Sequence, residues 1–359
     1  GLIAKKKKKK EASYKAQRAY PLHNISWSRI IFDEAHHLRN DNTRIYCGAA
    51  ELATSIRWLV TGTPIQNRKK DFYSLCSQMG LPSYYYKANN NLMDLVKRFI
   101  MKRTKKDAEI DLPEIHISTV RVSWESNGEK LLAENFHALL KFSNVQKKYA
   151  DNYISQLDLS TLTLLVRARQ ACVYPALIRG AWRGYVDNGV ICDESSAWKG
   201  LSGSSKMNKV VSKIIERAHN GLSKIVFCHF RGEIDFIQHR LIREGLHVRV
   251  FDGRVKQSER EDLLSSSCDV LLLQIQTGCE GLNLQHFNEV YFVSPHWNPA
   301  VEDQAIARCH RIGQLKDVHV FRFVMEGFDD DDNTGSLDTY SADVQCIKRE
   351  IMTVLDVKE

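Results

Sequence analysis

Short apolar runs alternate with segments of helical spacing over two stretches of the chain. In the first stretch, apolar residues at 25–32 and 56–60 predict buried strands, and the spacing at 43–54 and 68–79 predicts helices. After residue 206 the same alternation predicts strands at 224–228, 247–251, 269–275, 289–293 and 317–324, and helices at 206–218, 231–243, 257–265 and 300–310. Alternating strands and helices are typical of parallel sheets covered by helices. The pattern therefore predicts an α/β fold with two parallel sheets.

The part of the chain between these stretches has a different pattern. Residues 91–104 and 127–178 have mostly helical spacing, whereas 120–124 alternate as a strand does. The Gly- and Ser-rich segment 198–206 predicts a linker, and the acidic segment 326–345 is predicted to be disordered. We therefore divide the chain into five parts: a Lys-rich segment 1–20, a first α/β region 21–115, a helical insertion and linker 116–205, a second α/β region 206–325 and an acidic tail 326–359.

The chain has 359 residues, a length typical of about two domains, and its net charge of +8 is unevenly distributed. Residues 1–120 contain 22 Lys and Arg against 11 Asp and Glu, whereas residues 326–359 contain 3 against 10. A basic front half favours a polyanionic partner, most often nucleic acid, although surface lysines are also common in other proteins. The apolar runs are too short to span a membrane, and six lysines at 5–10 stand where a secretory signal has its apolar core.

Nine cysteines are scattered along the chain without a C-x-x-C pair, so we expect no zinc site. Their odd number and dispersal favour reduced thiols, most of them buried as small apolar side chains. Five histidines lie in separate predicted elements without ligand spacing, which favours core or hinge roles over metal binding: His36, His37, His229, His296 and His310.

An acid pair, Asp33 and Glu34, directly follows the first predicted strand. Ligands of open α/β sheets bind beyond the carboxyl ends of the strands. In the Walker B arrangement, an aspartate at this point holds the Mg²⁺ of a bound nucleotide, and the next glutamate orients and deprotonates the attacking water. Acids also collect at helix N-termini, so the pair by itself leaves both interpretations open.

Further motifs follow in a fixed order: DEAH at 33–36, RWLVTGTPIQN at 57–67, GLNL at 281–284 and HWNPAVEDQAIARCHRIGQ at 296–314. Together they resemble the motifs of the SWI/SNF-type ATPases of helicase superfamily 2. RQACVYP at 169–175 makes the resemblance closest to the branch of the helicase-like transcription factor and related DNA-repair translocases. The resemblance covers most of the chain and implies two RecA-like parallel-sheet lobes with helical insertions.

The resemblance also implies the activity, an ATP-dependent translocation along double-stranded DNA, with ATP and Mg²⁺ as cofactors. It implies that Asp33 binds Mg²⁺ and that Glu34 is the general base. Arg308 and Arg311, three apart on one predicted helix and therefore on one face, would be arginine fingers across the cleft between the lobes.

Other positions of the motifs would bind nucleotide or DNA. Gly281 and Gln304 are implied to lie beside the nucleotide. The implied DNA contacts are Thr61, Thr63, Gln66, Asn67, Arg231, Trp297 and Asn298, although a core position suits Trp297 equally well. The implied partners are double-stranded DNA and nucleosomes or other DNA-bound proteins, in chromatin remodelling, transcription or DNA repair in the nucleus, with no membrane and no zinc.

Three features depart from the family's pattern. No G-x-x-x-x-G-K-[ST] loop occurs, so we expect the first lobe to be incomplete and this chain alone to be inactive as an ATPase. The stretch 179–205 contains a single cysteine, Cys192, and so cannot form the RING finger of many relatives. The segment 277–281 reads TGCEG, which loses one of the family's glycines and gains an acid.

Two alternatives follow from these features. An RNA helicase would use the same DEAH box, but the TGTPIQN and HRIGQ segments argue against that class. A non-catalytic DNA- or partner-binding remnant of such an ATPase stays open, because the phosphate-binding loop is absent from the sequence.

Overall fold

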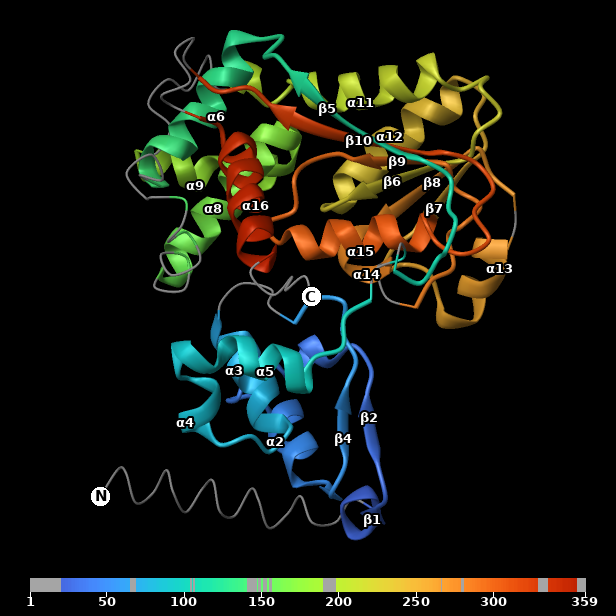
Figure 1. Ribbon diagram of the computed structural model, residues 1–359. Helices are drawn as coiled ribbons and strands as arrows, with labels where there is room; N and C mark the ends of the chain where they lie inside the picture. The colour runs from blue at the N-terminus through green and yellow to red at the C-terminus, as the bar shows by residue number, and fades with distance from the viewer. Residues whose placement is uncertain are drawn as a thin grey trace. The chain divides into compact units, whose positions relative to one another are not determined.

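A computed structural model describes residues 21–64, 69–103, 105, 107–140, 147, 150, 154, 157–189, 198–265, 267–278, 281–328 and 335–353. The chain divides into two compact units, the first comprising residues 1–102 and 352–359 and the second residues 103–351. Both units combine helices with strands that pair in parallel (Figure 1). The predicted α/β class with parallel sheets is therefore confirmed.

The first unit contains two small parallel sheets. In one, β2 (Ile30–Phe32) pairs with β4 (Arg57–Leu59), and in the other β1 (Ser26–Trp27) pairs with β3 (Ala53–Thr54). Phe32 and Leu59 pack against a small core that includes Leu38 and Leu75. The helices of this unit are η1 (Pro21–Asn24), η2 (Ala35–Leu38), α2 (Arg44–Glu51), α3 (Lys69–Gln78), α4 (Ser83–Tyr86), η3 (Asn89–Asn91) and α5 (Leu92–Phe99).

The second unit is built on a six-stranded parallel sheet in the order β5-β10-β9-β6-β8-β7. All five residues of the strand KIVFC are buried, as expected for a parallel strand covered on both faces. The six strands are β5 (Ile115–Val122), β6 (Lys224–Cys228), β7 (Val248–Phe251), β8 (Val270–Gln274), β9 (Glu289–Phe292) and β10 (Val318–Met325).

Helices cover both faces of this sheet (Figure 1). Apolar residues of α11 and α12 pack with one face, and those of α15 pack with the other. The helices of the unit are α6 (Asn127–Leu140), α8 (Leu159–Val173), η6 (Pro175–Ala181), α9 (Trp182–Asp187), α11 (Ser205–Glu216), α12 (Arg231–Arg243), η7 (Gln257–Glu259), α13 (Arg260–Ser265), α14 (Ile275–Gly278), α15 (Pro299–Cys309) and α16 (Leu337–Thr353).

Two parts of the unit differ from the sequence prediction. The prediction of disorder over 326–345 is wrong for the described residues, because α16 begins at Leu337 and buries Leu337, Tyr340 and Val344 in the main core. Its acidic residues misled the prediction, since Asp338 is paired inside the protein rather than solvated. The predicted boundary after residue 115 falls within β5, which pairs along its whole length with β10.

Candidate nucleotide and DNA site

In the first unit, the two motifs with candidate chemistry follow neighbouring strands. The parallel pairing of β2 and β4 places Asp33 and Glu34, after β2, beside Thr61, after β4. A backbone hydrogen bond of 2.9 Å from Ala35 N to Val60 O extends this pairing beyond the strands. The DEAH and TGT segments therefore meet at one sheet edge, where parallel α/β sheets bind ligands.

His36 connects these two segments. Its ring is 4% exposed, with Nδ1 lying 3.3 Å from Glu34 Oε2 and 3.4 Å from Thr61 Oγ1. Thr61 Oγ1 in turn accepts a hydrogen bond of 3.1 Å from the backbone N of Thr63, which is itself buried. His36 therefore takes part in a polar chain from Glu34 to Thr63. Gln66 and Asn67 lie outside the described residues.

Asp33 and Glu34 occupy a sharp turn at the end of β2. Glu34 has a left-handed backbone, with φ 45° and ψ 46°, and its N–H donates to Asp33 Oδ1 at 2.8 Å. A non-glycine residue in this region is uncommon and is typical of functional turns. The turn leaves the Asp33 side chain exposed.

The Asp33 carboxylate fits a Mg²⁺ ion in the setting of a bound nucleotide. Mg²⁺ prefers oxygen ligands and usually takes one or two carboxylates together with phosphates and waters. Among the described residues no group of three or more His, Cys, Asp or Glu is arranged to hold a metal ion. Asp33 would be a carboxylate ligand of such an ion.

In the second unit, the candidate arginines lie at the end of α15. Arg308 is in the last turn of the helix and Gln304 lies one turn earlier on the same face. The prediction that Arg311 shares this face is wrong, because the helix ends at Cys309 and His310 leaves helical geometry with φ −93° and ψ 76°. Arg311 instead projects from the exposed turn that follows.

The segment that begins at Gly281 contacts this helix end at Leu284. The φ of Gly281, +77°, is a conformation that favours glycine, and the backbone N of Leu284 donates to Arg308 O at 3.3 Å. The GLNL segment is therefore joined directly to the last turn of α15.

The remaining DNA candidates have different surroundings. Arg231 is exposed at the start of α12. Asn298 is the N-cap of α15 and its Oδ1 accepts from Ala300 N at 3.1 Å. Trp297 is partly buried and stacks on Tyr340 of α16, with ring centroids 6.1 Å apart. Of the two roles that the sequence left open for Trp297, a DNA contact or a core position, this packing favours the core position.

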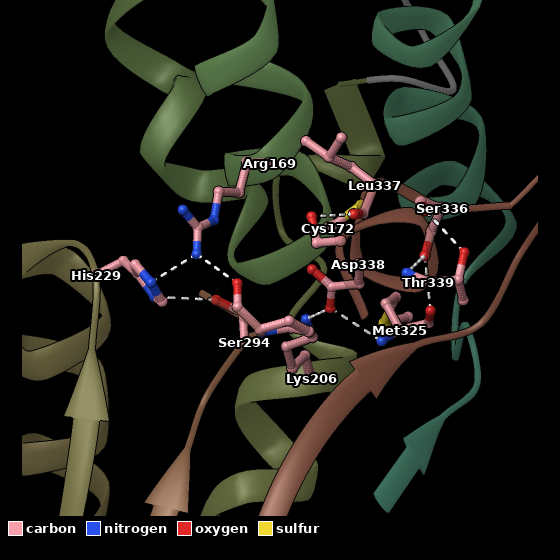
Figure 2. A network of polar contacts seen from close by, with 12 residues as sticks. Arg169, Cys172, Lys206, His229, Ser294, Met325, Ser336, Leu337, Asp338 and Thr339 are labelled. Carbon is pink, nitrogen blue, oxygen red and sulfur yellow. Dashed lines mark hydrogen bonds and ion pairs between the residues drawn. The ribbon is translucent and has the colours of Figure 1, made fainter. Parts of the chain in front are cut away.

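A polar network that the sequence did not predict joins Arg169, His229 and Ser294 (Figure 2). Arg169 Nη2 lies 2.6 Å from His229 Nε2 and donates to Pro295 O at 2.7 Å, while Ser294 Oγ lies 3.1 Å from His229 Nδ1. Burial, and then the Arg169 charge, hold the pKa of His229 well below its usual value. The available signal was an arginine in LLVRARQACV, next to the positions Ala168 and Gln170 that the helix buries.

Lys206 and Asp338 form a second part of this network. Lys206 Nζ donates to Asp338 Oδ2, which also accepts from Met325 N at 3.0 Å. The two side chains are 0% and 3% exposed. Their pairing joins the first turn of α11 to the first turn of α16 across the end of β10.

Each of the two units contains a segment that matches the model of a known domain family. A model of the SNF2-related domain matches residues 12–85, and a model of the helicase conserved C-terminal domain matches residues 205–313. Among the described residues, no helix has the length and apolar content of a membrane span.

Three curated relatives illustrate the similarity. A probable global transactivator of Orgyia pseudotsugata multicapsid polyhedrosis virus is 27% identical over 328 residues, covering 87% of this chain and 64% of that protein. The DNA repair protein RAD5B of Arabidopsis thaliana is 25% identical, covering 88% and 34%. The human SWI/SNF-related matrix-associated actin-dependent regulator of chromatin subfamily A member 1 is 26% identical, covering 84% and 30%. The chain thus spans less than two thirds of each of these relatives.

Among solved structures, the C-terminal part of the Fun30 ATPase domain aligns with a TM-score of 0.44 at 14% identity. The alignment covers 68% of this chain and 99% of that one.

Proposed function

The chain belongs to the SWI/SNF-type family of helicase-like ATPases, and from that premise we propose that it is part of an ATP-driven translocase acting on double-stranded DNA. The observation that supports the proposal most directly is the meeting of Glu34, His36 and Thr61 where β2 and β4 end. His36 would connect Glu34, which acts on the nucleotide, to the turn at Thr61, which contacts DNA.

The candidate site residues of the first unit have distinct roles in the proposed reaction. The Glu34 carboxylate orients the attacking water and accepts its proton. Asp33 would hold Mg²⁺, which would supply charge neutralisation at the phosphates. His36 transmits a displacement of Glu34 to the Thr61–Thr63 turn, which we assign, together with Gln66 and Asn67, to the DNA backbone.

In the second unit, we assign Arg308 and Arg311 to the negative charge that develops on the transferring phosphoryl group. Gln304 and Gly281 would support the nucleotide from the same helix end. Arg231 is the candidate of this unit for a DNA phosphate, because it is exposed. Trp297 and Asn298 would act indirectly, by holding the start of α15.

The relatives are named for chromatin remodelling and DNA repair, and from these names we extend the proposal to its setting. The natural substrate would be duplex DNA carrying nucleosomes or other bound proteins, in the nucleus. Grip through phosphates makes the binding insensitive to sequence.

A second candidate function is DNA or partner binding without hydrolysis. It is favoured by the sequence itself, which has no G-x-x-x-x-G-K-[ST] loop to supply amides and a lysine to the phosphates. On this ground we expect the 359-residue chain alone to hydrolyse ATP at a negligible rate.

The variant Glu34→Gln separates the candidates, measured in this chain and in the longest natural product of its gene. In the translocase, the variant binds ATP as the parent does but loses about 10²-fold or more in DNA-stimulated turnover, since the amide cannot accept a proton. Glu51→Gln, at an exposed position in α2, is the matched control and keeps full turnover.

Three outcomes decide the assignment. Loss of turnover in Glu34→Gln alone supports the translocase. Equal turnover in the parent and in Glu34→Gln excludes Glu34 as the base. Absence of turnover in the longest product, with DNA binding retained, establishes the non-catalytic alternative.

A further inference from the structure

Lys105 and Pro113 lie against the turn that carries Arg311. Lys105 Nζ donates to the backbone oxygen of His310 and lies 3.4 Å from its Nδ1. His310 Nε2 lies 2.8 Å from Pro113 O. Nε2 of His310 therefore faces a carbonyl oxygen, and its Nδ1 faces the Lys105 ammonium. His310 is thus held from two sides by a segment about two hundred residues away in sequence.

The same segment continues into the sheet beside the turn. Glu114 N donates to Asp317 Oδ1 at 3.0 Å, and Val318 N donates to Glu114 O at 2.9 Å. From there β5 pairs with β10 residue by residue. The sheet therefore fixes Glu114, the neighbour of Pro113, whose carbonyl oxygen faces His310.

The other end of the turn is anchored independently by Gln314, which is 6% exposed. Its Nε2 donates to Gln285 O at 2.8 Å and Phe287 O at 3.1 Å, and its Oε1 accepts from Asn288 Nδ2 at 2.9 Å. Arg311 therefore stands between two residues that are held in place, while its own side chain is exposed.

We propose that Lys105 is a positioning residue for Arg311, acting through His310 at the end of α15. The proposal rests on the function proposed above, in which Arg311 stabilises the transferring phosphoryl group. Lys105 itself has no contact with the reacting groups in this role. It determines where the turn begins and therefore where the Arg311 side chain can reach.

The electrostatics of a helix end explain why a lysine suits this position. The last carbonyls of α15 carry partial negative charge and attract a nearby cation. Lys105 occupies that place and donates to the backbone oxygen of His310, the residue that follows the helix. Packing against the turn, and then the positive charge of Arg311, lower the pKa of Lys105, which agrees with two cations held near each other.

The first experiment tests in the chain itself whether the contacts of Lys105 and Pro113 with His310, called the clamp below, hold the turn in place. It measures amide hydrogen exchange at His310 and Gln314. Both amides are bonded within the turn and its helix, His310 N to Ile306 O at 2.8 Å and Gln314 N to Arg311 O at 3.0 Å. Lys105→Ala should speed exchange at His310 at least about tenfold. Lys105→Arg should preserve protection, because arginine also donates to a carbonyl.

Lys209→Ala, at an exposed position in α11, is the matched control and leaves exchange at the turn unchanged. Unchanged protection in Lys105→Ala overturns the clamp, whatever the activity of the protein. His310→Ala removes the ring contacts from the other side and should also raise exchange at the turn.

The second experiment measures steady-state ATP turnover in the longest natural product of the gene. Lys105→Ala should lower kcat by about 10²-fold, the effect of misplacing a catalytic group by about 1 Å. The KM for ATP should stay within about twofold, since a group acting mainly in the transition state affects kcat. Lys105→Arg should restore kcat to within a few-fold of the parent.

The outcomes distinguish this proposal from the proposed function. A parent without turnover overturns the translocase, and with it the role of Lys105. An active parent in which Lys105→Ala keeps full kcat overturns the positioning role alone. A rise in KM at constant kcat also overturns it, because that pattern indicates lost ground-state binding.

Discussion

Glu233, at the start of α12, is fully buried, and its Oε2 accepts from His229 N at 3.0 Å. Within the described part of the chain, its Oε1 has no hydrogen-bond partner. Burial raises the pKa of this carboxyl to about 7, against the opposing effects of His229 N and the Arg169 charge. A carboxyl with a raised pKa binds its proton more tightly in the folded state than in the unfolded one.

The sign of the resulting pH dependence follows from this difference. In an unfolded chain the pKa of Glu233 is about 4.5. The contribution of Glu233 to stability is fully present below that pH and is lost as the pH rises through the folded-state pKa of about 7. Glu233→Gln, which is neutral at every pH, should therefore gain stability relative to the parent between pH 5 and pH 8. Urea unfolding at several pH values measures the difference.

Glu244→Gln is the control for this prediction, because Glu244 is exposed at the end of the same helix. Its stability relative to the parent should not change with pH over this window. A Glu233→Gln difference that stays constant with pH would contradict the assignment of a proton to Glu233.

At the scale of elements, α16 depends on contacts far from it in sequence. Besides the Lys206–Asp338 pair, Gln345 Nε2 donates to Glu302 Oε1 at 2.6 Å, and Lys348 Nζ lies 5.3 Å from the Trp297 ring centroid. The helix thus covers the segment that leads into α15 and fixes it from outside.

Asp338→Asn should destabilise the chain by about 3–5 kcal/mol, because it leaves the Lys206 charge buried without a partner. Chemical denaturation of the chain measures this loss. Asp343→Asn is the control in the same helix. Asp343 pairs with Lys147, and both side chains are nearly half exposed, so that loss should stay within about 1 kcal/mol.

Replacing the Lys206–Asp338 pair together tests the mechanism. Lys206→Met combined with Asp338→Asn should cost less than Asp338→Asn alone, since no unpaired charge remains buried. A double variant that is less stable than the single variant would instead assign the loss to packing around Met325 and Asp338.

At the scale of the whole molecule, the basic charge is concentrated in the first 120 residues. Contacts between these side chains and phosphates release counterions, so affinity for duplex DNA falls steeply with salt. For about four neutralised phosphates, the Kd should rise about 10²-fold between 50 and 200 mM salt. Fluorescence anisotropy with two duplexes of equal length and unrelated sequence measures both the slope and the sequence dependence.

Equal affinities for the two duplexes, with the expected slope, would support a grip through phosphates. A Kd that does not respond to salt, or that differs strongly between the duplexes, would contradict the proposed mode of binding. Because no phosphate-binding loop is needed for this contact, the test does not depend on ATP turnover.

The sequence by itself determined the elements whose pattern is local. The apolar run Lys224–Cys228 and the helical spacing over Arg231–Arg243 were predicted with the bounds that β6 and α12 have in the structure. The motifs likewise identified the family and placed Asp33 and Glu34 directly after a strand. These features follow from periodicity and from the chemistry of neighbouring residues, which the order of residues specifies directly.

Only the tertiary structure decided features that depend on distant partners. Glu114 and Asp317 meet although they are 203 residues apart, and this contact starts the pairing that makes β5 an outer strand of the second sheet. α15 ends at Cys309, and the next residue, His310, has non-helical geometry and contacts Lys105 and Pro113, about two hundred residues away in sequence. An acidic segment became a buried helix because Lys206 lies opposite Asp338. The free energy of each arrangement comes from groups that meet only after folding, and no local pattern of apolar and polar positions contains it.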